Sequence, residues 1–345
     1  MTETINAAVL GASGYTGAET IRILAGHPKV EVAAVSANAL AGQMLGHVFP
    51  HLDGLFDLAL LKAEDIDWSS VDVVFGCLPH GASQDLIESL PDHVRIIDLS
   101  ADYRLRDPDL YEVTYGRAHI APDRTRAAVY GLTEHARSRL PGADIIACPG
   151  CYPTATLLAL LPPVKAGLIE PSSVIIDAKS GVSGAGRGLK AGNLFSEAAE
   201  GLRPYAVGAH RHAPEIEQEL SLAAGESVPV TFTPHLVPMV RGELVTCHIR
   251  GDADEIHGAL SRAYQDERFV RVLPLGAPAP DTRHVRGSNT CLISVHGDRV
   301  PGRVVVVAVI DNLVKGSGGQ AVQNLNAALG WDEGLGLDTL APIFP

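Results

Sequence analysis

The stretch INAAVLGASGYTGAETIRILAGHPKVEVAAVSA, residues 5–37, decides the fold class. Residues 5–10 form a continuous apolar run that is typical of a buried strand, and residues 17–27 carry apolar side chains at the spacing of an amphipathic helix. A second strand-like run follows at residues 30–37, and glycines mark the turn between the first strand and the helix. This order predicts a βαβ unit, which is the building block of a parallel sheet.

The strand and helix rhythm continues up to Pro149 and then changes. The later strand-like runs of the first part are residues 71–78, 94–100 and 143–149. Longer segments that favour a mostly antiparallel or mixed sheet follow at residues 172–180, 228–240, 242–250 and 303–310. We therefore predict a Rossmann-like, doubly wound dinucleotide-binding domain of residues 1–150 and 316–345, and a second catalytic and oligomerisation domain of residues 151–315.

Composition narrows the functional classes. The chain has 345 residues, with 40 acidic against 27 basic side chains and a formal net charge of −13, which argues against a nucleic-acid partner. No apolar run approaches the roughly 20 residues that a membrane-spanning helix needs. The N-terminus lacks a basic segment of the secretory kind, so we expect a cytoplasmic protein. Five cysteines, an odd number, favour reduced thiols over a disulfide framework.

The glycine-rich turn GASGYTG, residues 11–17, predicts a nicotinamide dinucleotide site. Gly11, Gly14 and Gly17 lie between a strand and a helix, where a backbone without side chains lets a pyrophosphate approach the N–H groups of the helix start. The alternative is a turn that only connects two elements. The predicted cofactor-binding residues in this turn are Gly11, Ser13, Gly14, Tyr15, Thr16 and Gly17.

The residues after the second strand favour NADP(H) over NAD. An NAD site usually carries an acidic residue at this point, whose carboxylate holds the ribose 2′-hydroxyl and would repel a 2′-phosphate. Here the segment reads VSANALAG, with Ser36 and Asn38 and without an acid. We place Ser36 in the cofactor site. No arginine is evident nearby, which leaves the contacts of the 2′-phosphate unassigned.

Two cysteines flank a Pro-Gly turn in IIACPGCYPTATLLALL, residues 145–161. Cys148 ends an apolar strand and is predicted to be buried and inert. Cys151 falls at the predicted start of a helix, where the positive end of the helix dipole favours a thiolate and lowers a thiol pKa. Cys151 is therefore the candidate nucleophile. The alternatives are two core cysteines, a redox couple, or a zinc site completed by the two histidines of HRH; we expect no metal.

Three further segments offer polar groups for acyl chemistry. His210 and His212 are candidates for acid–base catalysis. Arg104, in a loop after a first-domain strand, suits a substrate carboxylate, and an exposed arginine paired with a neighbouring acid is the alternative. The Gly- and Ser-rich segment of residues 179–188, with Ser180 and Arg187, suits a phosphate group, and a flexible connection is the alternative.

Six motifs together resemble the N-acetyl-gamma-glutamyl-phosphate reductase family, within the broader group of phosphorylating aldehyde dehydrogenases. They are GASGYTG, SADYR, PGCYPT, SGVSGAGR, HRHAPEI and GQAVQN, and they extend from residue 11 to 324. The resemblance implies a glyceraldehyde-phosphate dehydrogenase-like fold, a homodimer or homotetramer, and NADPH-dependent reduction of an acyl phosphate through a cysteine thioester. It makes Cys151 the nucleophile and His210 or His212 the proton carrier. It also places Arg104 and Glu215 at the substrate, and Asn312 and Gly316 near the nicotinamide.

Two rival hypotheses remain. A related reductase takes aminoadipyl or glutamyl phosphate attached to an acidic carrier protein, but such an enzyme needs a basic docking patch, and this acidic chain has no basic cluster. A non-catalytic NADP-binding sensor would have no use for a cysteine at a helix start together with an arginine and paired histidines. A small-molecule acyl phosphate is therefore the predicted substrate.

Overall fold

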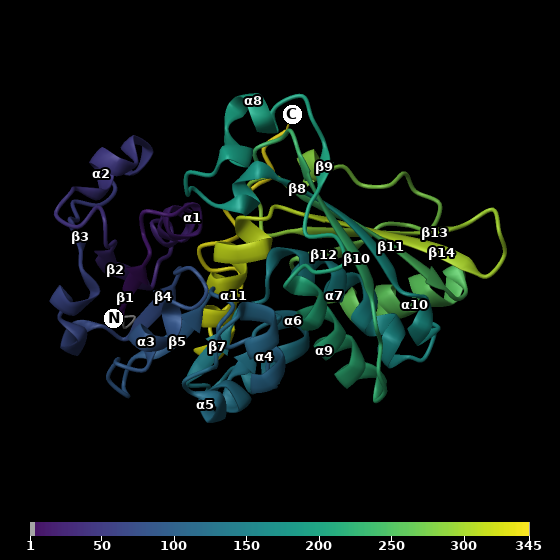
Figure 1. Cartoon of the computed structure of the whole chain (residues 1–345), viewed down its shortest axis with the longest axis horizontal. Coiled ribbons are helices and arrows are strands. Elements are labelled where there is room, and N and C mark those ends of the chain that lie inside the picture. The colour runs from purple at the N-terminus through teal and green to yellow at the C-terminus, as the bar shows by residue number, and fades with distance from the viewer. Residues whose placement is uncertain (1–3, 345) are drawn as a thin grey trace. The chain divides into compact units, whose positions relative to one another are not determined.

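The computed structural model describes residues 4–344, which form two compact units (Figure 1). The first unit comprises residues 4–149 and 317–340, and the second comprises residues 150–316 and 341–344. The chain therefore leaves the first unit just before Cys151 and returns to it after Gly316.

The first unit is built on a seven-stranded sheet in the order β3-β2-β1-β4-β5-β7-β6. Every strand pair in it is parallel. The strands are β1 (Ile5–Leu10), β2 (Val30–Ser36), β3 (Leu60–Leu61), β4 (Val73–Gly76), β5 (Arg95–Asp98), β6 (Val129–Tyr130) and β7 (Ile145–Ala147). β1 lies between β2 and β4, because the chain adds β2 and β3 on one side of β1 and then crosses to the other side for β4. The predicted parallel, doubly wound sheet is confirmed.

Helices cover this sheet, and the last of them comes from the far end of the sequence. The helices are α1 (Tyr15–Leu24), α2 (Leu45–Val48), α3 (Ser83–Ile87), α4 (Pro108–Tyr115), α5 (Pro122–Ala127), α6 (Thr133–Ala136) and α11 (Gly319–Ala328). Helix α11 packs against α1 and α6, and its Gln320 and Asn324 side chains donate to the carbonyl oxygen of Gly131 at 3.3 and 2.7 Å. The C-terminal helix thus belongs to the sheet that the N-terminal residues begin.

The second unit contains a mixed seven-stranded sheet in the order β12-β13-β14-β11-β8-β10-β9. The strands are β8 (Ile175–Gly181), β9 (Arg203–Pro204), β10 (Thr231–Val237), β11 (Glu243–Arg250), β12 (Val270–Val272), β13 (Cys291–Gly297) and β14 (Arg303–Ile310). β10 pairs with β8, and β12 with β13, in parallel, whereas the remaining pairs are antiparallel. β8 continues to Gly181, so the first residues of the predicted Gly-rich loop are strand instead.

Three long helices cover one face of this sheet: α7 (Cys151–Lys165), α9 (His212–Ala224) and α10 (Ala253–Tyr264). Helix α7 packs on β11 and β14 and is flanked by α9 and α10. Its residues from Tyr152 to Val164 are all buried, which explains why this helix is apolar on every side. A short helix, α8 (Phe195–Ala198), lies in the long connection between β8 and β9. Among the helices of residues 4–344, none has both the length and the hydropathy of a membrane span.

Candidate active site

Helix α7 begins at Cys151, where the sequence predicted a helix start. Gly150 precedes it as N-cap with extended backbone (φ −63°, ψ 160°), and a glycine has no side chain that could bond to the first N–H groups of the helix. Cys151 is partly exposed. A thiol in the first turn of a long helix lies at the positive end of the helix dipole, which favours its ionised form.

Cys148, three residues earlier, has a different environment. It is 1% exposed, and burial raises the pKa of its thiol to about 12. The Asn324 side-chain amide donates to its sulfur at 3.5 Å. Burial likewise raises the pKa values of Cys77 and Cys247 to about 12. The expectation of a buried thiol at Cys148 agrees with this position.

Glu215 contacts the turn that precedes Cys151. This residue lies in the first turn of α9, is buried, and accepts a hydrogen bond from the Gly150 N–H at 2.8 Å. The first N–H groups of a helix have no partner within the helix, so a carboxylate from a neighbouring helix stabilises this helix start. Glu215 was predicted to contact substrate; the structure gives it a second role in holding the backbone beside Cys151.

Glu243 is a carboxylate that the sequence analysis missed. It is fully buried at the start of β11, and burial, reinforced by the charge of Asp311, raises its pKa to about 8. Cys151 lies within hydrogen-bonding reach, and this contact favours the ionised carboxylate. A signal was present in the sequence: in ELVTCHIR the strand period of two places Glu243 on the same face as Val245 and Cys247, which are both buried.

The two predicted catalytic histidines lie together at the start of α9, around the ring of Tyr152. The His210 and His212 ring centroids are 4.8 Å apart and lie 5.8 and 5.9 Å from that of Tyr152. The backbone N–H of His212 donates to Nδ1 of His210 at 3.1 Å. Burial, with a smaller contribution from Arg211, lowers the pKa of His210 to about 4. His210 is therefore neutral near pH 7, with its ring proton on Nε2.

Gly316 and Asn312 lie close to this cysteine and to β11. A Cβ on Gly316 would stand 2.8 Å from the Cys151 Cβ, so only glycine leaves room for the cysteine there. The Asn312 side chain accepts from the Gly242 N–H and donates to Ser183 Oγ, each at 2.9 Å. Gly316 therefore borders Cys151, and Asn312 joins the residue before β11 to the segment after β8. Their predicted contact with the nicotinamide stays a prediction.

The two side chains that were predicted to bind a phosphate group differ in their solvent exposure. Ser180 is buried on β8, opposite Glu243 in the antiparallel pairing with β11, and donates to the Gly181 carbonyl oxygen at 3.1 Å. Arg187 is exposed beyond the 3₁₀ helix of Val182–Ala185. The structure thus places Ser180 near the Cys151 surroundings and Arg187 on a solvated segment.

Arg104, in the first unit, is buried, so the alternative of an exposed arginine is wrong. Its Nε donates to the Cys148 carbonyl oxygen at 2.8 Å and its Nη2 to the Leu99 carbonyl oxygen at 2.9 Å. Nearby Asp98 is fully buried, and burial raises its pKa to about 6. Arg104 thus supports the backbone that leads to Cys148, and its contact with substrate stays a prediction.

The glycines of the turn before α1 differ in whether protein packing requires them. Gly11 has φ +71°, and a Cβ there would lie 2.4 Å from the Cys77 carbonyl oxygen. A Cβ on Gly17 would lie 2.5 Å from the Gly11 carbonyl oxygen. Protein packing therefore requires both glycines. At Gly14 the nearest such contact is an ordinary 3.4 Å, so packing within the unit does not explain this glycine. The position at the N-cap of α1 is one where the backbone N–H groups of a helix start can meet a phosphate, so the turn fits a dinucleotide.

The other predicted cofactor residues surround this turn. Tyr15, Thr16 and Ser13 are at least partly exposed, with Tyr15 as the first residue of α1. Ser36 is buried at the end of β2, and its carbonyl oxygen accepts from the Ala12 N–H at 2.8 Å. Within residues 4–344, no group of three or more His, Cys, Asp or Glu side chains is placed to hold a metal ion.

Family models match both parts of the chain. Residues 6–143 match the NAD binding domain of semialdehyde dehydrogenases, and residues 151–312 match the semialdehyde dehydrogenase dimerisation domain. The N-acetyl-gamma-glutamyl-phosphate reductase of Rhodospirillum rubrum is 56% identical, and the alignment covers 100% of both chains. The chain belongs to the N-acetyl-gamma-glutamyl-phosphate reductase family.

Other members of this family match over similar lengths. The enzyme of that name from Paracoccus denitrificans is 52% identical over 99% of this chain and 100% of its own. A probable chloroplastic N-acetyl-gamma-glutamyl-phosphate reductase of Arabidopsis thaliana is 51% identical over 99% of this chain and 86% of its own. The family resemblance predicted from the six motifs is confirmed.

Solved structures confirm the fold class. Aspartate semialdehyde dehydrogenase II of Vibrio cholerae, solved in complex with ASA, superposes with a TM-score of 0.71 at 18% identity, covering 95% of this chain and 99% of that one. The aspartate semialdehyde dehydrogenase of Candida albicans, solved with NADP, gives a TM-score of 0.67 at 18% identity and the same coverage. At this identity the likeness concerns the fold. The match to the NAD binding domain assigns a nicotinamide cofactor to the first unit.

Proposed function

We propose that this chain reduces N-acetyl-gamma-glutamyl phosphate to N-acetyl-L-glutamate 5-semialdehyde with NADPH, in arginine biosynthesis. Relatives that are 50–56% identical over nearly the whole chain carry the name of this reductase. The observation that carries the proposal is the partly exposed Cys151 at the start of α7, between buried carboxylates and paired histidines. The cytoplasmic location stays a prediction.

Cys151 performs the covalent chemistry in this proposal. Its thiolate attacks the carbonyl carbon of the acyl phosphate, a C–S bond forms, the C–O bond to phosphorus breaks and inorganic phosphate leaves. The bound nicotinamide would supply the hydride that reduces the resulting thioester. Collapse of the thiohemiacetal then breaks the C–S bond, which releases the aldehyde and returns the thiolate. The position of Cys151 at a helix start favours the anionic sulfur both when it attacks the substrate and when it leaves the thiohemiacetal.

The two histidines have different proposed roles at the substrate oxygen. His210, neutral and protonated on Nε2, offers a hydrogen-bond donor rather than an exchangeable proton near pH 7. In this proposal it stabilises the negative charge that develops on the oxygen, and His212 exchanges the proton. Arg104, Glu215, Ser180 and Arg187 are the proposed substrate-binding residues. Of these, Glu215 accepts a hydrogen bond from Gly150, the residue before the cysteine.

The cofactor proposal rests on the turn before α1. Gly14, whose missing side chain is not required by packing, is the proposed point of pyrophosphate contact. The preference for NADP follows from the absence of an acid in the segment after β2, because a carboxylate there would repel the 2′-phosphate. Ser36, Ser13, Tyr15 and Thr16 complete the proposed set, with Asn312 and Gly316 toward the nicotinamide.

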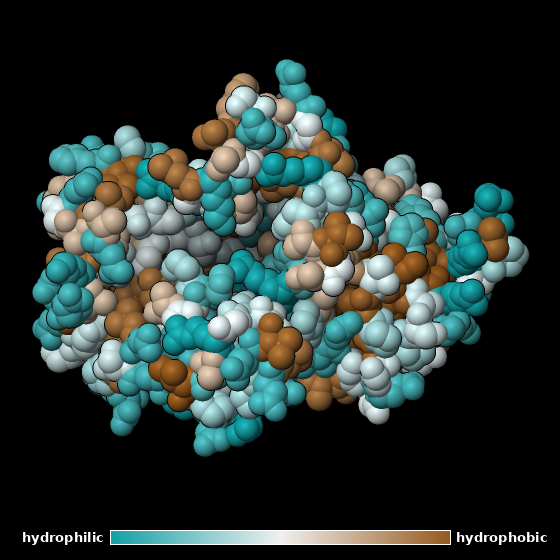
Figure 2. Space-filling model, in the orientation of Figure 1, coloured by the Kyte–Doolittle hydropathy of each residue, from teal (hydrophilic) through white to brown (hydrophobic). Residues whose placement is uncertain are grey.

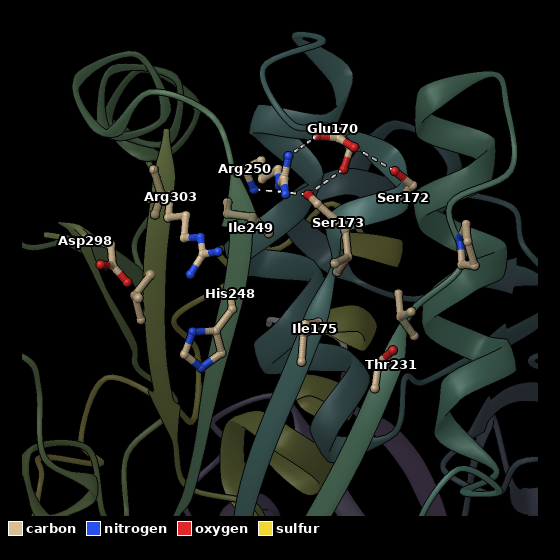
Figure 3. A pocket seen from close by; sticks show the side chains of 15 residues that line it. Glu170, Ser172, Ser173, Ile175, Thr231, His248, Ile249, Arg250, Asp298 and Arg303 are labelled. Carbon is tan, nitrogen blue, oxygen red and sulfur yellow. Dashed lines mark hydrogen bonds and ion pairs between the residues drawn. The ribbon is translucent and has the colours of Figure 1, made fainter. Parts of the chain in front are cut away.

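The second unit offers two surfaces for the proposed homodimer or homotetramer. Side chains from β8, β10, β11 and β14 line a hollow on the sheet, which includes Ile175, Thr231, His248 and Arg303 (Figure 3). At its edge Arg250 pairs with Glu170 at 3.7 Å. The segment around α8 exposes Leu189 by 99% and Phe195 by 86%, and brown side chains mark it in Figure 2. The dimerisation-domain match supports burial of these surfaces against a second copy.

The deciding experiment runs the reaction in its oxidative direction. The purified chain is mixed with N-acetylglutamate 5-semialdehyde, NADP and phosphate, and nicotinamide absorbance is followed. We expect phosphate-dependent reduction of NADP, a lower rate with NAD, and loss of the rate in Cys151→Ser. A chain that shows no phosphate dependence, or that works only with a carrier-linked aldehyde, would contradict the proposal.

A further inference from the structure

Glu243 is in an unusual position for a carboxylate. It begins β11 on the face that packs against α7, in phase with the buried Val245, Cys247 and Ile249. The side chain is 0% exposed, and neither carboxylate oxygen forms a hydrogen bond of good geometry with a residue from 4 to 344. A buried carboxyl group without such bonds costs free energy, so its presence calls for a functional reason.

The functional reason is indicated by the contact between Glu243 and Cys151. The thiol lies within hydrogen-bonding reach of the Glu243 carboxyl, and desolvation together with the buried Asp311 charge raises the pKa of Glu243 to about 8. Asp311 accepts hydrogen bonds from the N–H groups of Gly287 and Leu313 at 2.7 and 2.8 Å. An ordinary thiol has a pKa of about 8.5. The Glu243 carboxyl therefore binds a proton about as tightly as an ordinary thiol does.

The other groups around Glu243 are poorer proton acceptors. Tyr152, from α7, and Tyr205, after β9, have pKa values raised by burial and in part by the Glu243 charge itself, so both stay protonated. His210 has its Nδ1 occupied by a backbone N–H and its pKa lowered by burial. The strand neighbours of Glu243 are Ser180 on β8 and Ile310 on β14. Arg241, the preceding cation, lies 3.6 Å from Asp311.

We propose that Glu243 is the acid–base partner of Cys151. Before the attack, the S–H proton passes to a Glu243 carboxylate oxygen, and the electron pair of the resulting thiolate then forms the C–S bond. When the C–S bond breaks and the aldehyde leaves, the same proton returns to the sulfur. The proton that the departing phosphate needs comes from His212 or from solvent. The inference rests on the proposed function because it takes Cys151 as the nucleophile.

The first test needs no substrate. Carboxamidomethylation of Cys151 by iodoacetamide is measured by peptide mass spectrometry from pH 6 to 10 in the wild type, Glu243→Gln, Glu243→Asp and the matched control Glu255→Gln, which changes an exposed glutamate of the same unit. Two coupled groups titrate in two steps, so the wild-type rate should rise in two steps. Glu243→Gln should show one step, and Glu243→Asp and Glu255→Gln should keep two.

The second test uses turnover. Loss of a proton acceptor lowers kcat by about 100-fold or more, with the KM for aldehyde nearly unchanged. Glu243→Gln should show this loss, and Glu243→Asp should recover part of it. If no form of the protein reduces NADP, the proposed function fails. The labelling profiles would still test whether Cys151 and Glu243 titrate as a coupled pair.

Stability provides a check that Glu243→Gln is folded. The pKa of Glu243 in the folded state lies above that of an unfolded glutamate, so the folded state binds the extra proton, and this contribution to stability is lost as pH rises from about 4 to about 8. Glu243→Gln should therefore melt at or above the wild-type temperature at pH 9. A one-step wild-type labelling profile, or a Glu243→Gln variant with the wild-type profile and kcat, would overturn the inference.

Discussion

Helices α1 and α7 begin in the same way and serve different chemistry. Each follows a glycine N-cap with extended backbone, φ −86° and ψ 167° at Gly14 and φ −63° and ψ 160° at Gly150. A glycine N-cap has no side chain that could bond to the helix, and neither helix has an acidic residue in its first turn. Both starts therefore present backbone N–H groups and a positive dipole end to an anion.

The difference lies in what surrounds each start. At α7 the anion is part of the chain: Cys151 is the first helical residue, with Glu215 on the adjacent N–H and Glu243 beside the thiol. At α1 the turn is shaped by packing at Gly11 and Gly17, while Gly14 is left without a packing requirement. The same kind of helix start thus suits a nucleophilic cysteine at α7 and a bound phosphate at α1.

The largest predicted effect concerns the α7 start. Cys151 should react with iodoacetamide at pH 8 about 100-fold faster than Cys148, because burial keeps Cys148 protonated and inaccessible. Peptide mass spectrometry at short times measures both rates in the native protein, and Cys151→Ser should leave only the slow reaction. Equal rates at the two cysteines would break the comparison, since the helix start would then confer no reactivity.

An intermediate effect separates the glycines of the α1 start. Gly14→Ala should leave the melting temperature nearly unchanged and raise the KM for NADP by about tenfold, or about 1.4 kcal/mol, because the added methyl group faces the bound phosphate. Gly17→Ala should instead destabilise the fold by roughly 1–3 kcal/mol, since its Cβ overlaps the Gly11 carbonyl. Thermal melts and cofactor titrations distinguish the two. A stability loss in Gly14→Ala without a change in KM would remove the cofactor argument.

The smallest effect tests the carboxylate that holds the α7 start. Glu215→Gln keeps an oxygen that can accept the Gly150 N–H, so its stability should stay close to the wild-type value. Glu215→Ala leaves that buried N–H without this acceptor and should lower stability by about 1–3 kcal/mol. Chemical denaturation compares the two variants. Equal stability of both would show that the hydrogen bond does not hold the turn, and a raised substrate KM in Glu215→Gln would support its proposed contact with substrate.

The elements that sequence reasoning predicted are those with strong local signals. The apolar runs of β1 and β2 and the helix start at Cys151 are specified by residues close together in the chain. Strands β3 and β6, each of two residues, escaped prediction because so short a run has no measurable period. The burial of Arg104 also escaped prediction, because its acceptors include the carbonyl of Cys148, which is remote in sequence.

The sequence by itself determined the doubly wound first unit, the thiol at a helix start and the family, because backbone preference, hydrophobic period and turn chemistry act over a few residues. Only the tertiary structure decided which groups surround Cys151. Glu215 meets the Gly150 N–H across 65 residues of chain, and Glu243 reaches the thiol only because β11 packs against α7. Proton affinity depends on burial and on neighbouring charges, and these exist only once the chain is folded.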